Sequence, residues 1–263
     1  MKGTKNKGRE ERKRSEEKRR GEKKIGTTRM EYKSDLKKSN PILILNFKNY
    51  LEVAGGKSIE LAKAAQQVSE SYNGRIEIVA APPQPALSLV RENVNISVFA
   101  QHIDDANEGS TTGFFIPEIV QSFGVQGSLI NHSEHRIKSP DTIRSLVNRL
   151  KKLEMVSVVC ARTPAEVSDI AKFEPDYIAI EPPELIGSGK AVSKENPSIV
   201  TDSIHSAAKV SQNVKVICGA GITDAADVKS ALKLGAKGIL VASGVIKATS
   251  WIDKISELAS GYE

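Results

Sequence analysis

A glutamate at the end of an apolar run is the side chain in this sequence best placed to do chemistry. Glu181 directly follows the strand-like run Tyr177–Ile180 and precedes two prolines and a loop that ends in two glycines. Side chains alternate along a strand, so Tyr177, Ala179 and Glu181 share one face. Prolines stiffen the start of the loop, and glycines widen its choice of backbone angles. The pattern is typical of a catalytic base beside a lid with rigid hinges, although a surface glutamate before a turn is the alternative interpretation.

Two polar side chains end another apolar run, residues 42–45. A period of two places Ile44, Asn46 and Lys48 on one face of this strand. An ammonium group without a partner is unfavourable in a cleft, so this face predicts an anionic substrate as the partner of Lys48. The alternative is a lysine that is exposed to solvent beyond the end of the strand.

A histidine follows a third run, residues 127–130. With a period of two, His132 shares a face with Ser128 and Ile130, and we expect it to point into the same site as the glutamate. One alternative is a histidine that is hydrogen-bonded only within the fold. Another is a metal site shared with His135, but no nearby cysteine and no third ligand follow at a suitable interval. The sequence therefore predicts no metal.

Small residues follow the last two apolar runs. One run ends in Cys218-Gly219-Ala220-Gly221-Ile222 and the other in Val241-Ala242-Ser243-Gly244. Small side chains let backbone N–H groups approach an anion closely, and a short helix after the last run would direct its N-terminal dipole at that anion. The two turns together predict a phosphate-binding site.

The elements that must position these residues follow a regular alternation of strands and helices. Eight strand-like runs occur at residues 42–45, 76–80, 97–100, 127–130, 156–160, 177–180, 214–218 and 238–241. Helical patterns separate most of them, which calls for βα units, a parallel sheet and the α/β class. Eight such units favour a closed (β/α)8 barrel, in which polar residues at the C-terminal strand ends are typically catalytic. An open doubly wound sheet is the alternative, but its G-x-G-x-x-G fingerprint is missing from the first βα turn.

The ends of three helices can be predicted from capping residues. Thr163 with Glu166 forms a capping box, with a proline at the first helical position. Ser139 opens a helix that runs to about residue 153. Asp224 opens another, and Gly235 suits the end of that helix.

The positive charge of the chain is concentrated at its start. Residues 1–40 hold 16 of the 38 Lys and Arg and 7 of the 32 Asp and Glu, a net charge of +9, whereas the other 223 residues carry −3. With few large apolar side chains, residues 1–40 are predicted to be a disordered basic extension, and residues 41–263 the barrel domain. The extension could contact nucleic acid, but no motif specifies such a partner. Met30 begins a more ordinary stretch, and we expect the functional start near it.

Neither a membrane nor a secreted location is indicated. No apolar run approaches the roughly 18–20 residues that span a bilayer. Cys160 and Cys218 each end an apolar run, which predicts two buried thiols in a reducing cytoplasm.

Taken together, these motifs resemble the triosephosphate isomerase family, in the short form found in archaea. The resemblance covers about residues 41–263. It rests on motifs in the family's order, namely Asn46-x-Lys48, His132-Ser133-Glu134, Glu181-Pro182-Pro183-Glu184-Leu185-Ile186-Gly187-Ser188-Gly189, Cys218-Gly219-Ala220-Gly221-Ile222 and Ala242-Ser243. Pro183-Glu184-Leu185 replaces the Val-Trp-Ala that is usual in bacteria and eukaryotes, and Gly221 stands where a serine is usual. The archaeal form shares both departures.

The resemblance implies a TIM barrel that interconverts dihydroxyacetone phosphate and D-glyceraldehyde 3-phosphate in glycolysis and gluconeogenesis, without a cofactor. By position it makes Glu181 the base, His132 the electrophile, and Lys48 with Asn46 the substrate-binding pair. The residues implied to line the phosphate site are Ile186, Gly221, Ala242 and Ser243. It also implies a homotetramer or otherwise a dimer, with residues 104–115 as our candidate contact.

Two other functions fit part of the pattern. Another phosphosugar barrel, related to indole-glycerol-phosphate synthase or phosphoribosylanthranilate isomerase, would share the two phosphate loops but not the combination of Asn46, Lys48, His132 and Glu181. A non-enzymatic protein that binds RNA through its basic extension would not need these four residues intact.

Overall fold

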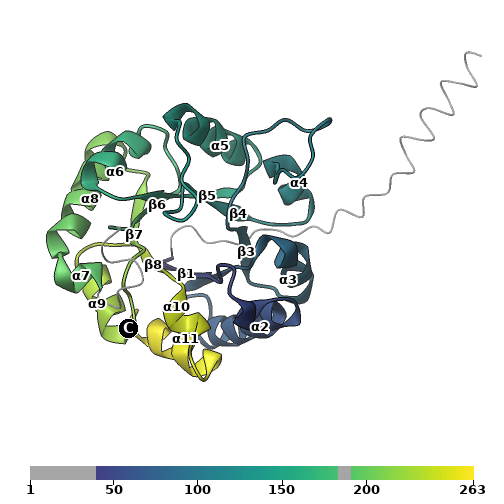
Figure 1. Cartoon of the computed structure of the whole chain (residues 1–263). Helices are drawn as coiled ribbons and strands as arrows, with labels where there is room; N and C mark the ends of the chain where they lie inside the picture. Colours follow the sequence, from purple (N-terminus) through teal and green to yellow (C-terminus); the bar gives the residue numbers. More distant parts are fainter. Residues whose placement is uncertain (1–39, 183–190) are drawn as a thin grey trace, which may run out of the picture. The chain divides into compact units, whose positions relative to one another are not determined.

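Eight parallel strands close into a barrel in the computed structural model, which describes residues 40–182 and 191–263 (Figure 1). The strands are β1 (Ile42–Asn46), β2 (Glu77–Ala81), β3 (Ser97–Ala100), β4 (Gly127–Ile130), β5 (Val156–Ala161), β6 (Tyr177–Ile180), β7 (Lys215–Cys218) and β8 (Gly238–Val241). The first strand pairs with both the second and the last, so that Ile42 lies opposite Glu77 and Gly238. The predicted (β/α)8 barrel is therefore confirmed, and the open sheet is excluded.

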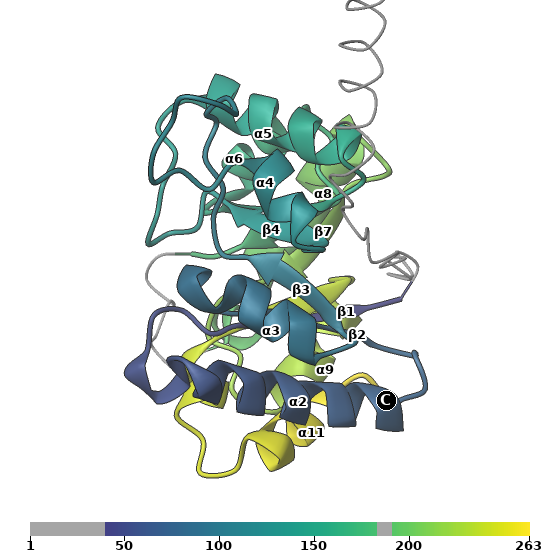
Figure 2. The ribbon, with the colours of Figure 1, turned by 90° about the vertical axis from the view of Figure 1, so that its right-hand side faces the viewer.

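Helices surround the strands in both views (Figures 1 and 2). The helical elements in chain order are η1 (Leu51–Val53), α2 (Gly56–Ser71), η2 (Gln84–Ala86), α3 (Leu87–Asn93), α4 (Pro117–Ser122), α5 (Pro140–Lys152), α6 (Pro164–Ala171), α7 (Val192–Glu195), α8 (Pro197–Val210), α9 (Ala225–Lys233), α10 (Ser243–Ile246) and α11 (Trp251–Ser260). Among the described helices, none is long and apolar enough to cross a membrane.

The predicted helix ends are confirmed, with one difference. The Thr163 side chain accepts from the Glu166 N–H, but the Glu166 carboxylate accepts from the N–H of Arg162, one residue before the cap. The predicted capping box is thus half formed there. Asp224 caps α9 in a complete box, and Gly235 follows the end of that helix at a φ of 102°, where glycine is favoured.

The apolar residues form two layers on either side of the strands. The layer inside the barrel consists of Ile42, Ile44, Val79, Ala81, Phe99, Leu129, Val156, Val158, Cys160, Tyr177, Ala179, Ile217 and Leu240. Ile178 and Ile180 lie in the other layer, between strands and helices. The alternation predicted for the run before Glu181 is therefore confirmed, and it points this side chain into the interior of the barrel.

Some predictions fall on residues that the structure does not describe. Ile186 and nearly all of the basic extension predicted for residues 1–40 lie outside the described residues. Cys160 and Cys218 are both buried free thiols, as predicted.

Candidate active site

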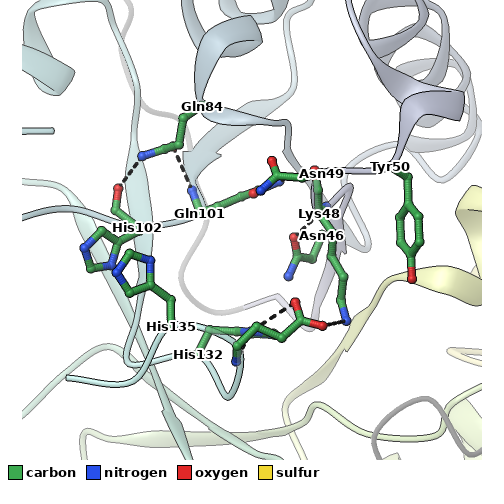
Figure 3. Close-up of a pocket in the computed structure, with 10 residues that line it drawn as sticks. Asn46, Lys48, Asn49, Tyr50, Gln84, Gln101, His102, His132 and His135 are labelled. Carbon is green, nitrogen blue, oxygen red and sulfur yellow. Dashed lines mark hydrogen bonds and ion pairs between the residues drawn. The ribbon is translucent and has the colours of Figure 1, made fainter. Parts of the chain in front are cut away.

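A cavity of about 360 Å³ lies at the C-terminal ends of the strands, which we call the mouth of the barrel (Figure 3). The residues that line it all carry polar groups and come from several βα units. The residues that line it are Asn46, Lys48, Asn49, Tyr50, Gln84, Gln101, His102, His132, Glu134 and His135.

Glu181 follows β6 at the mouth and is almost fully buried. Its N–H donates to Ala161 O at 2.8 Å, which keeps it in line with the strand, and the residue is 2% exposed. Among the described residues, the Glu181 Oε2 atom has no hydrogen-bond partner. Burial disfavours the ionised form and raises the pKa of this carboxyl to about 7. A carboxylate so placed is a strong candidate for a base at neutral pH.

His132 lies beside this glutamate, but not for the reason expected from the sequence. Leu129 belongs to the layer inside the barrel and Ile130 to the layer under the helices. We predicted that His132 points into the site because it shares a strand face with Ser128 and Ile130. That reason is wrong, because this face points away from the mouth. Asn131 has a φ of 63°, and this left-handed residue ends the alternation and turns His132 into the mouth.

The hydrogen bonds of His132 favour a neutral ring. Its Nδ1 accepts from the Glu134 N–H at 3.2 Å, and its Nε2 lies 3.6 Å from Glu181 Oε1. Burial lowers the pKa of His132 to about 4, which the nearby Lys48 and Arg136 cations reinforce. A neutral ring that accepts at Nδ1 carries its proton on Nε2. Residues 133 and 134 form a turn and not the start of a helix, so burial, and not a helix dipole, is the main reason for the neutral ring, and the Glu134 N–H fixes which nitrogen carries the proton.

Lys48 already has a partner in the mouth, which corrects the expectation that only a substrate could supply one. Its Nζ lies 2.6 Å from Glu134 Oε1. The backbone of Lys48 is left-handed at a φ of 49°. Its N–H donates to Asn46 Oδ1 at 3.0 Å, and Gln101 Nε2 donates to its carbonyl at 3.0 Å. The predicted pair Asn46 and Lys48 is thus brought together and braced by β3.

The loops after β7 and β8 lie side by side. Gly221 has a φ of 74°, which favours glycine, while Ala242 caps α10 and Ser243 begins that helix. A Cβ on Gly244 would lie 3.7 Å from Ile222 O, so the two loops are in contact. The three predicted phosphate-site residues that the structure describes therefore gather in one place.

Sequence reasoning missed part of the mouth. His102 and His135 stack with ring centroids 3.8 Å apart, and Gln84 Nε2 donates to His102 O at 2.7 Å. In Figure 3 the two stacked histidine rings lie across the cavity from Asn46 and Lys48. The polar pair Gln101 and His102 directly after an apolar run was the available signal. Among the described residues, no group of three or more His, Cys, Asp or Glu is placed to hold a metal ion.

Comparison with known proteins identifies the family. The family model described as "Triosephosphate isomerase" matches residues 41–258. The chain belongs to the triosephosphate isomerase family. A triosephosphate isomerase from Cenarchaeum symbiosum is 51% identical over 220 residues, which cover 84% of this chain and 97% of that protein. Those from Methanocaldococcus jannaschii and Methanothermus fervidus are 45% and 44% identical, covering 82% and 83% of this chain and 98% and 97% of their own lengths.

Membership in the triosephosphate isomerase family establishes the reaction. The family interconverts dihydroxyacetone phosphate and glyceraldehyde 3-phosphate in glycolysis, and the chain is an intramolecular isomerase of class EC 5.3.1.1. The other phosphosugar barrels and a purely RNA-binding protein are therefore excluded as its main function.

Proposed function

We propose that Glu181 and His132 carry the proton transfers of this isomerisation, with Lys48 and Asn46 as the substrate-binding pair. The observation that supports this assignment best is the 3.6 Å between His132 Nε2 and Glu181 Oε1, both buried at the mouth. A substrate carbon and its neighbouring carbonyl oxygen then meet a base and a donor at the same time. The family is itself a standard example of a glutamate base beside a neutral histidine, so only the assignment to these residues is new.

The chemistry follows from these roles. The Glu181 carboxylate removes a proton from C1 of dihydroxyacetone phosphate, and the electron pair of that C–H bond forms the C1–C2 double bond. The carbonyl electrons move onto the C2 oxygen, where the His132 Nε2–H donates a hydrogen bond. The C2 oxygen then takes the Nε2 proton of His132, and the same nitrogen takes the proton of the C1 hydroxyl. The electrons of that O–H bond form the C1=O bond of the aldehyde, while the electrons of the C1–C2 double bond take the proton that Glu181 returns to C2. Because the carboxyl pKa is raised to about 7, Glu181 can both accept and release a proton near neutral pH.

Charge stabilisation is the proposed role of Lys48. Its ammonium group, held by Glu134 at 2.6 Å, supplies a fixed positive charge for the enediolate and the substrate phosphate. We assign phosphate binding to backbone N–H groups of Gly221, Ala242 and Ser243, as small residues in loops after β7 and β8 often do in this fold. Ile186 completes the set by resemblance alone. These steps use no cofactor.

The experiment that tests the base is Glu181→Gln in a coupled spectrophotometric assay with glyceraldehyde 3-phosphate. General bases contribute about 10²–10⁴-fold, so we expect turnover to fall by at least that range while affinity for a phosphoglycolate-like inhibitor stays close to that of the wild type. A variant with near wild-type turnover would remove Glu181 from this role, and Glu184 would be the next candidate.

We also propose that the chain assembles, as a tetramer or otherwise a dimer. Three exposed large apolar side chains lie in α4 or within a few residues of its ends: Phe114, Ile119 and Phe123 are 54%, 50% and 54% exposed. Phe115 instead packs against the core, so the Phe114-Phe115 pair is divided between surface and interior. Apolar side chains concentrated in this way favour association.

Assembly is tested by light scattering at micromolar concentration. We expect an oligomer for the wild type, and smaller particles when Ile119→Lys places a charge in the apolar patch. A wild-type monomer with full activity would refute the proposal.

The buried free thiols Cys160 and Cys218 support a cytoplasmic location, where thiols stay reduced.

A further inference from the structure

Asn131 is a candidate for a role that the isomerisation mechanism does not yet assign. It is 1% exposed, it directly precedes His132, and its φ is 63°. Left-handed backbone is unfavourable for residues other than glycine, and asparagine tolerates it best among them. The strand before it points Leu129 into the barrel and Ile130 toward the helices. Without the left-handed turn, continued alternation would point His132 toward the helices.

The Asn131 side chain also fastens the loop that follows β4. Its Nδ2 donates to Cys160 O at 3.0 Å, and its Oδ1 accepts from the Ile137 N–H at 2.9 Å. The last β4–β5 pair is Ile130 opposite Val159, so the amide continues the contact between the two strands where the backbone turns away. The primary amide supplies the donor and the acceptor on two separate atoms, so it can bond both partners at once.

The backbone of Asn131 is held from a second direction. Arg136 Nη1 donates to Asn131 O at 3.2 Å, and the same guanidinium group is paired with Glu166 at the start of α6. The His135 N–H donates to His132 O at 2.8 Å. Residues 131–137 therefore form a loop closed on Asn131, with the histidine inside it.

We propose that Asn131 is a positioning residue for His132: its left-handed backbone aims the ring at Glu181, and its amide holds the loop in that conformation. The inference rests on the proposed role of His132 for its effect on turnover, but not for its effect on the ring itself. Removing the amide leaves the buried Cys160 carbonyl and the half-buried Ile137 N–H without their side-chain partner, which loosens the loop.

Two substitutions separate the two parts of the role. Asn131→Gly keeps the left-handed backbone and loses the amide, whereas Asn131→Ala loses the amide and strains the backbone. A displacement of about 1 Å in a catalytic group reduces turnover by about 10²-fold. We expect kcat to fall about 10-fold in the glycine variant and about 10²-fold in the alanine variant, with KM changed much less.

The matched control is Asn73, which also has a left-handed backbone, at a φ of 50°, but lies in the turn after α2 and is exposed. Asn73→Gly and Asn73→Ala test the cost of the backbone alone and are expected to keep kcat. The direct readout is the titration of the His132 ring by NMR in each variant. We expect its pKa to rise toward the ordinary 6.5 in Asn131→Ala and to stay low in the Asn73 variants.

The outcomes distinguish this inference from the proposed function. If His132→Gln loses turnover while both Asn131 variants keep kcat and an unchanged His132 titration, the positioning role is wrong and the proposed function stands. If His132→Gln keeps full turnover, the assignment of His132 fails, and the ring titration in the Asn131 variants still decides whether Asn131 positions it. Asn131→Gly provides the kcat comparison should Asn131→Ala fail to fold.

Discussion

Gly219 leaves the space that the Glu181 side chain occupies. A Cβ on Gly219 would lie 2.5 Å from Glu181 Cγ and 2.8 Å from its Oε1. Real Cβ atoms do not approach other atoms so closely, so a larger residue would displace the carboxylate or the loop after β7. The sequence predicted this glycine for phosphate binding alone, and the structure adds a role beside the candidate base.

Gly219→Ala is therefore expected to reduce turnover by about 10–10²-fold, because a base moved by about 1 Å loses its alignment with the substrate. Steady-state kinetics are the measurement. Gly56→Ala is the control, since a Cβ there meets nothing within 4 Å. If Gly219→Ala kept the kinetics of the control, Glu181 would have room that the structure does not show.

Lys48→Met should weaken the binding of phosphoglycolate-like inhibitors and slow turnover, because it removes the cation to which we assign stabilisation of the phosphate and the enediolate. The ion pair with Glu134 is lost at the same time. Lys57→Met removes an ion pair of the same length, 2.6 Å to Glu60, on α2 and serves as the control. Titration calorimetry with the inhibitor gives the comparison, and an unchanged affinity in Lys48→Met would count against this placement.

The buried Glu181 carboxyl predicts a dependence of stability on pH. Its pKa rises from 4.5 to about 7 on folding, so between these values the folded chain binds a proton that the unfolded chain does not. Stability from this group is present at low pH and is lost as the pH rises toward 7. Glu181→Gln carries no titrating group at this position. From acidic to alkaline pH, its unfolding free energy should therefore rise by about 1–3 kcal/mol relative to that of the wild type.

Urea unfolding of both proteins at about pH 5 and about pH 8 measures this difference. A difference in unfolding free energy that is the same at the two pH values would show that Glu181 ionises normally in the folded chain.

The strands could be predicted from the sequence because barrel strands are buried on both faces and appear as short apolar runs. Every predicted run agrees with the observed strand to within one residue at each end. Asn46, Lys48 and Glu181 could also be placed, since each comes at or just after a strand end, with alternation intact up to Asn46 and Glu181.

Alternation failed where the backbone changed conformation. At Asn131 the left-handed backbone turns His132 to the opposite side from the one that alternation predicts. An asparagine in the sequence is not enough to predict such a turn. The partner of Lys48 could not be read either, because Glu134 lies 86 residues away along the chain. The orientation of His132 and the partner of Lys48 both depend on contacts between separate βα units at the mouth. The periodicity of residues within one unit carries no information about those contacts.

The basic extension should not contribute to catalysis. Residues 1–40 carry a net charge of +9 with few apolar groups, so we expect a chain that begins at Met30 to keep the kinetic constants and melting temperature of the full chain. Any RNA affinity should reside in the deleted part and fall steeply with salt. RNA binding at two salt concentrations and the isomerase assay make the comparison, and a large loss of activity on truncation would place the boundary elsewhere.

The pairing of β1 with β8 has a consequence for synthesis on the ribosome. On this edge of β1, the Ile42 N–H donates to Lys237 O, and Ile42 lies opposite Gly238. The Ile42 carbonyl also accepts a hydrogen bond from the Tyr262 hydroxyl. All residues up to β8 must leave the ribosome before this edge is covered, and an uncovered strand edge can pair with another nascent chain. The β1 edge therefore stays open to such pairing from the time β1 emerges until β8 is made.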